Sequence, residues 1–364
     1  MAVDRRDLLK LGGAYAALAM LPGRARAQEK FISEPGPWRK FEIITHVAVG
    51  KPRGRTQAWI PVPSVFEEEW STPQGCDWKT NAKVARLERD QSTGAEMVYF
   101  EWAEAEAAPF GTVNSHTGTR DRLTDFTRPR KIKPLAEDAV KNYTAPPPPT
   151  DADTSLAETA ARITEKAKTD LGKAKAIYEW IVETKDCEMP VEYVAGAIVG
   201  GDTPRLRPCD RLNTLYVGLA RASGLPARTI HGLRIAQSQF GYPSLGAAPE
   251  ELSEAQHCRA EVWLEGYGWV PVDPADVRRA MRMEPPGNLA LTDAKMVSAR
   301  VTLFGGWEGN WVAYNLGGDL TLPESGGATV PALKYPLART GDVMLDPRET
   351  DQLAFTITAK ELPA

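Results

Sequence analysis

The chain has 364 residues, enough for two or three domains. Its hydrophobic content of 42% and charged content of 25% are those of a globular protein with a sizeable core. The formal net charge is −4 and the sequence holds no Lys/Arg-rich block, which argues against a nucleic-acid-binding surface.

The N-terminus reads MAVDRRDLLKLGGAYAALAMLPGRARAQ and resembles a twin-arginine export signal. Arg5-Arg6 precedes an apolar run from Leu11 to Leu21, which is shorter than the roughly 20 residues of a permanent membrane span. Ala25-Arg26-Ala27 fits a signal-peptidase site. We therefore expect export of the folded chain by the twin-arginine machinery, cleavage after Ala27 and a periplasmic location. Residues 1–27 carry three more basic than acidic residues, so the mature charge is near −7 rather than −4.

Residues 31–135 are expected to form an antiparallel β-sandwich. Short β-rich runs separated by Gly and Pro lie at 41–49, 57–62 and 97–102. Residues 110–143 are polar and have no clear period. The run from Ala145 to Thr150 contains four consecutive prolines and predicts a polyproline II spacer between domains.

After the spacer the hydrophobic period becomes helical. A capping box at 155–158, with Ser155 as its N-cap, predicts a helix to about residue 168. Asp170 is expected to cap a second helix that ends near residue 185. A third helix follows Pro208, and Gly224 is suited to its C-terminal cap. Strands are expected at 228–235, 257–264, 269–273, 301–304, 311–314 and 353–357.

Cys209 is the candidate nucleophile. Because proline favours the first helical position, Cys209 is expected at the second, among free backbone N–H groups and the positive end of the helix dipole. Such a site lowers the pKa of a thiol, and the N–H groups of Cys209 and Asp210 could hold an oxyanion. The alternative is a small buried cysteine that begins a core helix.

A cysteine nucleophile needs a histidine base and a group that orients the imidazole. The chain has four histidines. His46 lies within a predicted strand, His116 lies in a loop-like run, and the pattern gives His231 no partner in an evident register; all three are interpreted as structural residues. His257 opens one predicted strand, and Asp273 closes the next.

The register of this hairpin decides whether His257 and Asp273 can meet. If Trp263 pairs with Trp269, then Arg259 lies opposite Asp273. His257 and Asp273 are then diagonal neighbours, roughly 7–8 Å apart at Cα. The loop would run from Leu264 to Gly268. Cys258 would point away from His257, because successive side chains alternate between faces.

These residues resemble the transglutaminase-like superfamily. The resemblance covers about residues 155–280 and rests on three features: Cys209 at a helix start, the helix exit Gly224-Leu225-Pro226-Ala227-Arg228, and His257 followed 16 residues later by Asp273. It implies an α+β fold with a papain-like core at 151–280, preceded by the sandwich. A β-rich C-terminal extension at 281–364 is expected to follow, and the run Phe304–Trp311 is similar to an extension in bacterial members.

The resemblance implies a Cys209, His257 and Asp273 triad for amide chemistry through a thioacyl intermediate. The expected substrate is a peptide or protein, attacked next by water or by an amine, and no cofactor or metal is implied. Arg207 and Arg259 replace residues that members often have as Gly and as an aromatic. Arg259, Trp263 and Trp269, with Tyr267, are candidates for the substrate groove; hairpin packing is the alternative for the aromatics. A non-catalytic peptide-binding module is the alternative function.

Overall fold

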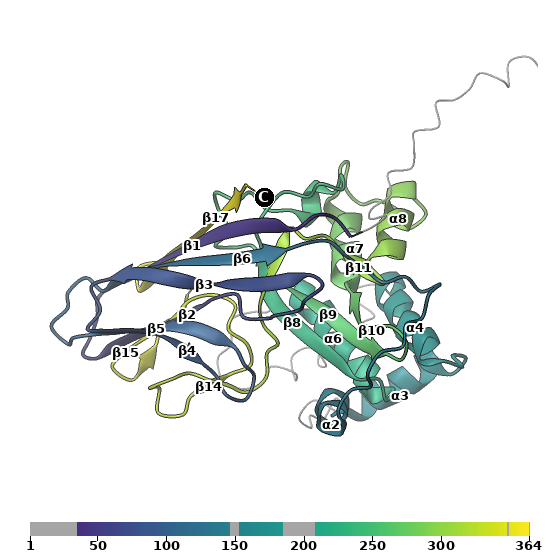
Figure 1. Ribbon diagram of the computed structural model, residues 1–364, viewed down its shortest axis with the longest axis horizontal. Coiled ribbons are helices and arrows are strands. Elements are labelled where there is room, and N and C mark those ends of the chain that lie inside the picture. The colour runs from purple at the N-terminus through teal and green to yellow at the C-terminus, as the bar shows by residue number, and fades with distance from the viewer. Residues whose placement is uncertain (1–34, 146–152, 185–207, 348, 364) are drawn as a thin grey trace, which may run out of the picture.

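The computed structural model describes residues 35–145, 153–184, 208–347 and 349–363, with backbone only at 153–155 and 208–210. The expected export signal and the proline run of the expected spacer lie outside these residues. The chain forms a β-rich lobe and a mixed lobe of helices around a sheet, which lie side by side (Figure 1).

The β-rich lobe consists of two antiparallel sheets that share a core. One sheet has the order β17-β1-β6-β3 and the other β16-β15-β2-β5-β4. Alternation along β1 turns Val47 and Val49 inward, where they meet Ile60 and Phe100 of the other sheet. The strands are β1 (Arg39–Val49), β2 (Thr56–Pro61), β3 (Ser71–Thr80), β4 (Val84–Arg89), β5 (Glu96–Trp102), β6 (Phe110–Thr119), β15 (Leu337–Thr340), β16 (Val343–Met344) and β17 (Leu353–Leu362).

The mixed lobe has an antiparallel sheet of order β10-β9-β8-β12, with helices packed against it. Its main core joins residues of the helices to Ala260, Val262 and Leu264 on one face of β9. Its elements are α3 (Asp153–Thr164), α4 (Asp170–Glu183), α6 (Pro208–Ala222), β8 (Ala227–Arg234), η2 (Pro243–Leu245), β9 (Gln256–Leu264), β10 (Gly268–Val272), α7 (Pro274–Met283), α8 (Ala294–Thr302) and β12 (Trp311–Asn315).

Short elements complete the described part of the chain. They are β7 (Arg122–Leu123), α2 (Glu137–Thr144), β11 (Gly306–Trp307), β13 (Leu320–Thr321) and β14 (Thr329–Val330).

The segment after residue 281 is divided between both lobes, whereas the sequence predicts one C-terminal extension. β12 pairs with β8 in the mixed lobe, and β15 and β17 pair with β2 and β1 in the sandwich. Each added strand satisfies the free backbone groups of an existing strand, which an independent unit would leave open. The strand predicted at 301–304 is wrong, because Asp293 caps α8, which continues to Thr302.

Other sequence predictions have mixed outcomes. The strands at 41–49, 57–62 and 97–102 are confirmed. The capping box at Ser155 is wrong, because α3 begins at Asp153. Asp170 is not a cap either, since the hydroxyl of Thr169 accepts from the N–H of Gly172 at 3.0 Å. Pro208 opens α6 as predicted, and Gly224 adopts a φ of +80° at its end.

A layer of arginine and tryptophan side chains joins the lobes. Glu261 on β9 is fully buried and pairs with Arg228 at 2.5 Å and with Arg122 of β7. The guanidinium of Arg122 stacks on Trp70 and Trp307, 5.2 and 4.9 Å from their ring centroids. The buried carboxylate is thus paired with Arg228 of β8 and with Arg122 of β7, and the stacking of Arg122 on Trp70 beside β3 links the sandwich to the sheet.

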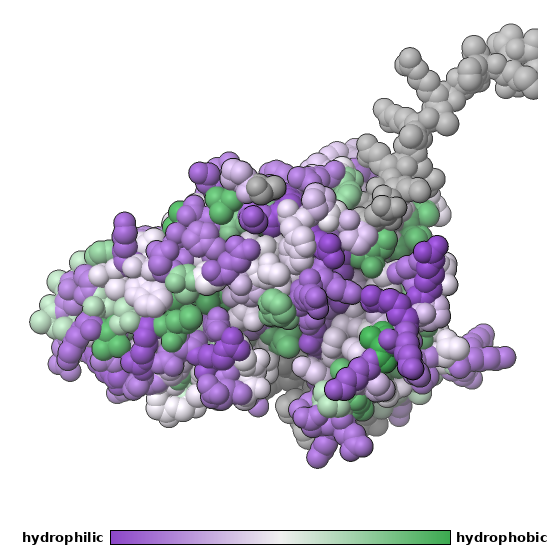
Figure 2. Space-filling view, viewed as in Figure 1, coloured by the Kyte–Doolittle hydropathy of each residue, from purple (hydrophilic) through white to green (hydrophobic). Residues whose placement is uncertain are grey.

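Polar residues predominate on the face in Figure 2, where apolar residues form small separate groups. Within the described ranges, we find no helix with the length and apolarity to cross a bilayer.

The substitution Glu261→Gln should destabilise the protein by about 3–5 kcal/mol, because it leaves two buried guanidinium groups without their carboxylate. The matched control is Glu67→Gln. Glu67 contacts Arg228 at 2.7 Å, but its side chain is 33% exposed, so its loss should cost less than about 1 kcal/mol. Urea unfolding measures both values, and equal losses would contradict the assigned role of Glu261.

Candidate active site

The hairpin of β9 and β10 has the register on which the site depends. Trp263 pairs with Trp269 and Ala260 with Val272, so Asp273 follows at the position opposite Arg259. Pairing extends to Leu264 and Gly268, which leaves a loop of three residues rather than the predicted five. The backbone φ angles of Gly266 and Gly268 are +82° and +76°, values that residues with a Cβ rarely adopt.

His257 and Asp273 form a buried pair. Nε2 of His257 donates to Oδ2 of Asp273 at 2.8 Å, and both side chains are at most 1% exposed. Asp273 is also the N-cap of α7, since Oδ1 accepts from the N–H of Asp276 at 3.0 Å. Nδ1 of His257 has no hydrogen-bond partner among the described residues. The imidazole is therefore oriented by one nitrogen and keeps the other for chemistry.

Asn213 on α6 holds the pair from a third element. Its Nδ2 donates to Oδ1 of Asp273 at 2.9 Å and to the carbonyl of Cys258 at 2.7 Å. Its Oδ1 accepts from the N–H of Ala275 at 3.3 Å. Sequence analysis missed this residue. A polar side chain between Leu212 and Leu215, on the apolar side of a predicted helix, was the available signal.

A second carboxylate, that of Asp276, lies beneath the imidazole. Its Oδ1 is 3.5 Å from Nε2 of His257. Arg234 donates to both of its oxygens, from Nη2 at 2.5 Å and from Nη1 at 3.2 Å. Although burial favours the neutral acid, Arg234 and His257 hold the pKa of the Asp276 carboxyl well below its usual range. Asp276 is therefore ionised beside the imidazole.

These charges decide the protonation of His257. Burial and Arg234 both oppose the imidazolium, but Asp276 and Asp273 outweigh them and raise the pKa of His257 to about 9. The imidazole is therefore charged at neutral pH, as required of a partner for a thiolate.

Arg259 does not line an open groove, contrary to the expectation. Its side chain is 2% exposed and lies over the rings of Trp307 and Trp311, 4.9 and 4.8 Å from their centroids. Nη1 donates to the carbonyl of Glu308 at 3.0 Å, and Nε is 3.5 Å from Oδ2 of Asp273. Burial lowers the pKa of Arg259 to about 10, so it remains a cation at neutral pH and adds positive charge beside Asp273.

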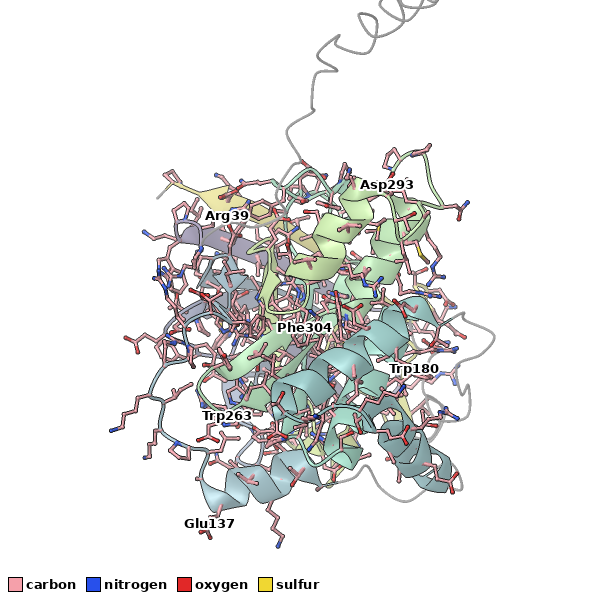
Figure 3. The ribbon with its side chains drawn as sticks, turned by 90° about the vertical axis from the view of Figure 1, so that its right-hand side faces the viewer. Arg39, Glu137, Trp180, Trp263, Asp293 and Phe304 are labelled. Carbon is pink, nitrogen blue, oxygen red and sulfur yellow. The ribbon has the colours of Figure 1, made fainter. Side chains whose placement is uncertain are left out.

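Trp263 and Trp269 lie at the turn end of the hairpin. Both are half-buried and pack edge to face, with their ring centroids 5.7 Å apart. The guanidinium carbon of Arg228 lies 4.2 Å from the ring centroid of Trp269. At about 3.3 Å per residue the two tryptophans are roughly 13–20 Å along the strands from Asp273 and His257. In Figure 3 Trp263 lies in the lower left part of the molecule, between Phe304 and Glu137, whereas Phe304, bridged to Val272, is near the centre. Their contacts are those of hairpin packing.

Cys209 is the second residue of α6, as predicted, and its side chain lies outside the described residues. The N–H groups of Cys209 and Asp210 belong to the first turn of the helix, where no intrahelical acceptor exists. The other histidines lie elsewhere. Nδ1 of His46 is 2.9 Å from Oγ1 of Thr112 and His116 is 3.7 Å from Glu42, both in the sandwich, and His231 is on β8.

His257, Asp273 and Asp276 also offer three ligand atoms within 4.8 Å of one another. Arg234 occupies both oxygens of Asp276 and Arg259 lies beside Asp273, so two fixed cations already balance the carboxylates. This charge balance disfavours a divalent ion.

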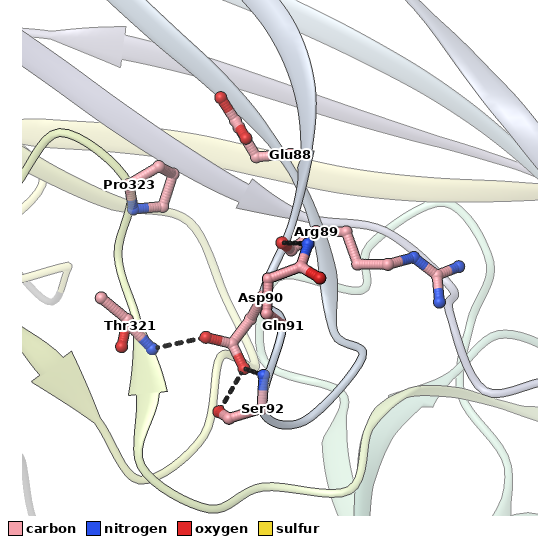
Figure 4. Close-up of a pocket in the computed structure, with 7 residues that line it drawn as sticks. All are labelled: Glu88, Arg89, Asp90, Gln91, Ser92, Thr321 and Pro323. Atoms are coloured by element: carbon pink, nitrogen blue, oxygen red, sulfur yellow. Dashed lines mark hydrogen bonds between the residues drawn. The ribbon is translucent and has the colours of Figure 1, made fainter.

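In the sandwich, a pocket of about 320 Å³ lies between the turn after β4 and β13 (Figure 4). One of the two carboxylates that line it, that of Asp90, accepts hydrogen bonds from Ser92, Thr93 and Thr321, which is the role of a loop anchor.

Comparison with known proteins identifies a family and a similar fold. The family model of the transglutaminase-like superfamily matches residues 157–274. Over 336 residues the chain is 28% identical to an uncharacterized protein of Haemophilus influenzae, covering 85% of this chain and 87% of that protein.

Two solved structures are similar in fold to different degrees. A putative cysteine protease from Cytophaga hutchinsonii superposes with a TM-score of 0.52 at 14% identity, over 91% of this chain and 93% of that one. This similarity concerns the fold alone. The periplasmic domain of TgpA from Pseudomonas aeruginosa gives a TM-score of 0.30 at 12% identity, over 68% of this chain and 91% of that one, which is too low to support a conclusion.

The charge of His257 makes stability depend on pH. Since its pKa rises from 6.5 to about 9 on folding, its contribution is complete below pH 6.5 and is lost as the pH rises through 9. In a Cys209→Ala background this loss should reach up to about 3 kcal/mol. Urea unfolding across this range, repeated with His257→Gln in the same background, measures it. The same pH dependence in both variants would exclude a raised pKa at His257.

Proposed function

Because residues 157–274 belong to the transglutaminase-like superfamily, we propose that the chain performs thiol-dependent amide chemistry with Cys209, His257 and Asp273 as its catalytic triad. The observation that carries the proposal is the buried His257–Asp273 pair, in which Nε2 is held and Nδ1 has no partner among the described residues. A base oriented in this way is what a cysteine nucleophile requires.

The place of Cys209 in α6 supports its role as the nucleophile. Residues four apart lie on the same face of a helix, so Cys209 shares a face with Asn213, which bonds Asp273 and the backbone beside His257. The helix start also favours a thiolate electrostatically. One turn of helix therefore links the proposed nucleophile to the proposed base and its orienting acid.

In the proposed reaction the Cys209 thiolate attacks an amide carbonyl, and the N–H groups of Cys209 and Asp210 stabilise the oxyanion. The imidazolium of His257 gives its proton to the leaving amine, which departs and leaves a thioacyl enzyme. His257 then accepts a proton from water, or from an amine, as that nucleophile attacks the thioacyl carbon; the C–S bond breaks, which releases the acid or the new amide and returns the Cys209 thiolate beside the imidazolium. Asp273 holds the imidazole in position throughout.

We favour hydrolysis of a periplasmic peptide or protein over transfer to an amine. The favoured outcome rests on the export signal expected at residues 1–27, since a periplasmic enzyme works in abundant water beside envelope peptides. In the alternative function, a peptide-binding module, the thiol would have no need of a charged partner. The charged His257 therefore favours catalysis.

The proposal predicts that iodoacetamide labels Cys209 at pH 6 at least tenfold faster than Cys76. Burial raises the pKa of the Cys76 thiol to about 11, which makes it a slow internal reference. Mass spectrometry of digested protein resolves the two sites. Labelling of Cys209 no faster than Cys76 would contradict an activated thiol.

The same protein, with residues 1–27 removed, should cleave members of a periplasmic peptide mixture, and Cys209→Ala should lose this activity at least a thousandfold. Mass spectrometry in the presence of a labelled amine separates hydrolysis from amine incorporation. Full activity in Cys209→Ala would exclude the triad.

A further inference from the structure

Asp276 faces the same imidazole nitrogen as Asp273 but has no place in the triad. Its Oδ1 is 3.5 Å from Nε2 of His257, which donates to Asp273 at 2.8 Å. We propose that Asp276, held by Arg234, is a positioning residue that stabilises the charged form of His257 and, through it, the thiolate of Cys209. This inference rests on the proposed function and adds a fourth side chain to its machinery.

The start of α7 explains why the Asp276 carboxylate is available. Asp273-Pro274-Ala275-Asp276 has the pattern of a capping box, in which the third acid would reach back to the N–H of the cap. Here the N–H of Asp273 donates to the carbonyl of Leu303 at 2.9 Å. The carboxylate of Asp276 is thereby released from capping and turns toward the sheet. The positive end of α7 favours its ionised form.

Arg234 fixes the direction of this carboxylate. Its two terminal nitrogens contact the two oxygens of Asp276, and Nη1 also donates to the carbonyl of Leu245 at 2.8 Å. Both side chains are at most 5% exposed. A planar fork of this kind restricts the carboxylate to one orientation, and in that orientation Oδ1 is shared between Arg234 and His257.

Among the described residues, the charged groups that face His257 lie at the start of α7, on β8 and on β9. Asp273 and Asp276 lie at the start of α7, Arg234 on β8 and Arg259 on β9. Glu308, before β12, acts through Arg259, and Tyr178 of α4 is neutral because burial raises its pKa.

The two carboxylates balance the two guanidinium groups. The imidazolium then adds one positive charge, which the thiolate of Cys209 can offset. Neutralising Asp276 would leave two guanidinium groups against one carboxylate, an excess of positive charge that disfavours the imidazolium.

The test is the pH dependence of Cys209 alkylation in the mature full-length protein. Asp276→Asn keeps the size of the side chain and removes its charge. We expect the midpoint of thiolate formation to rise by at least one pH unit, which slows labelling at pH 6 about tenfold. Asp276→Glu restores a carboxylate and should recover part of the shift.

Arg234→Gln provides the matched control of opposite sign. It removes the competing cation, so the midpoint should stay at the wild-type value or fall below it. The double variant Asp276→Asn/Arg234→Gln removes a neutral pair and should return the midpoint to within about half a unit of wild type. A purely structural role would move both single variants in the same direction, and circular dichroism checks that each is folded.

An unchanged midpoint in Asp276→Asn would overturn the inference. If that variant does not fold, Asp273→Asn provides the test, because it keeps the Asp276 carboxylate. In Asp273→Asn the midpoint of Cys209 thiolate formation should remain below about 8.5, the value of an ordinary thiol. A rise to that value would assign the whole effect to Asp273 and overturn the inference. Slow labelling of wild-type Cys209 would instead remove the proposed function itself, so the two failures are distinguishable.

Discussion

The carboxylate of Asp273 is the point on which the mixed lobe is organised. Its backbone ends β10, and one of its oxygens caps α7 and accepts from Asn213 on α6. Its other oxygen holds His257 at the start of β9. One buried side chain therefore joins four elements: the end of β10, the start of α7, helix α6 and strand β9. Because each contact fixes the position of the next element, the imidazole orientation follows from the fold rather than from a flexible loop.

The surrounding charges are arranged in two buried layers on one face of the sheet. This face carries His257, Arg259 and Glu261 of β9 and lies opposite the face that packs against the helices. Near the turn of the hairpin, Glu261 pairs with Arg122 and Arg228, and Glu67 supplies Arg228 with a second carboxylate. Near its open end, Asp273 and Asp276 balance Arg234 and Arg259 beneath His257. The guanidinium groups of Arg122 and Arg259 both stack on the ring of Trp307, so the two layers share this side chain. The sandwich is thus connected to the candidate site through stacked guanidinium groups, and its role extends to fixing the charges there.

The local features of the site were predictable from the sequence, and the long-range ones were not. Helix-start chemistry predicts the place of Cys209, and strand alternation states the pairing condition under which His257 and Asp273 share a face, because both depend on neighbouring residues. Arg259 was misjudged, since alternation gives its face but not the tryptophans that cover it from residues 307 and 311. The return of β15 and β17 to the sandwich likewise depends on pairing across some 280–320 residues, which no local pattern encodes.

The most direct test of the proposed triad is a crystal structure of the mature protein with a peptide aldehyde, which traps a cysteine nucleophile as a hemithioacetal. We expect a covalent bond from Cys209 Sγ to the aldehyde carbon. We also expect Nδ1 of His257 within about 4 Å of that sulfur, close to hydrogen-bond reach. An aldehyde left free, or a Cys209 sulfur directed away from His257, would contradict the proposed triad.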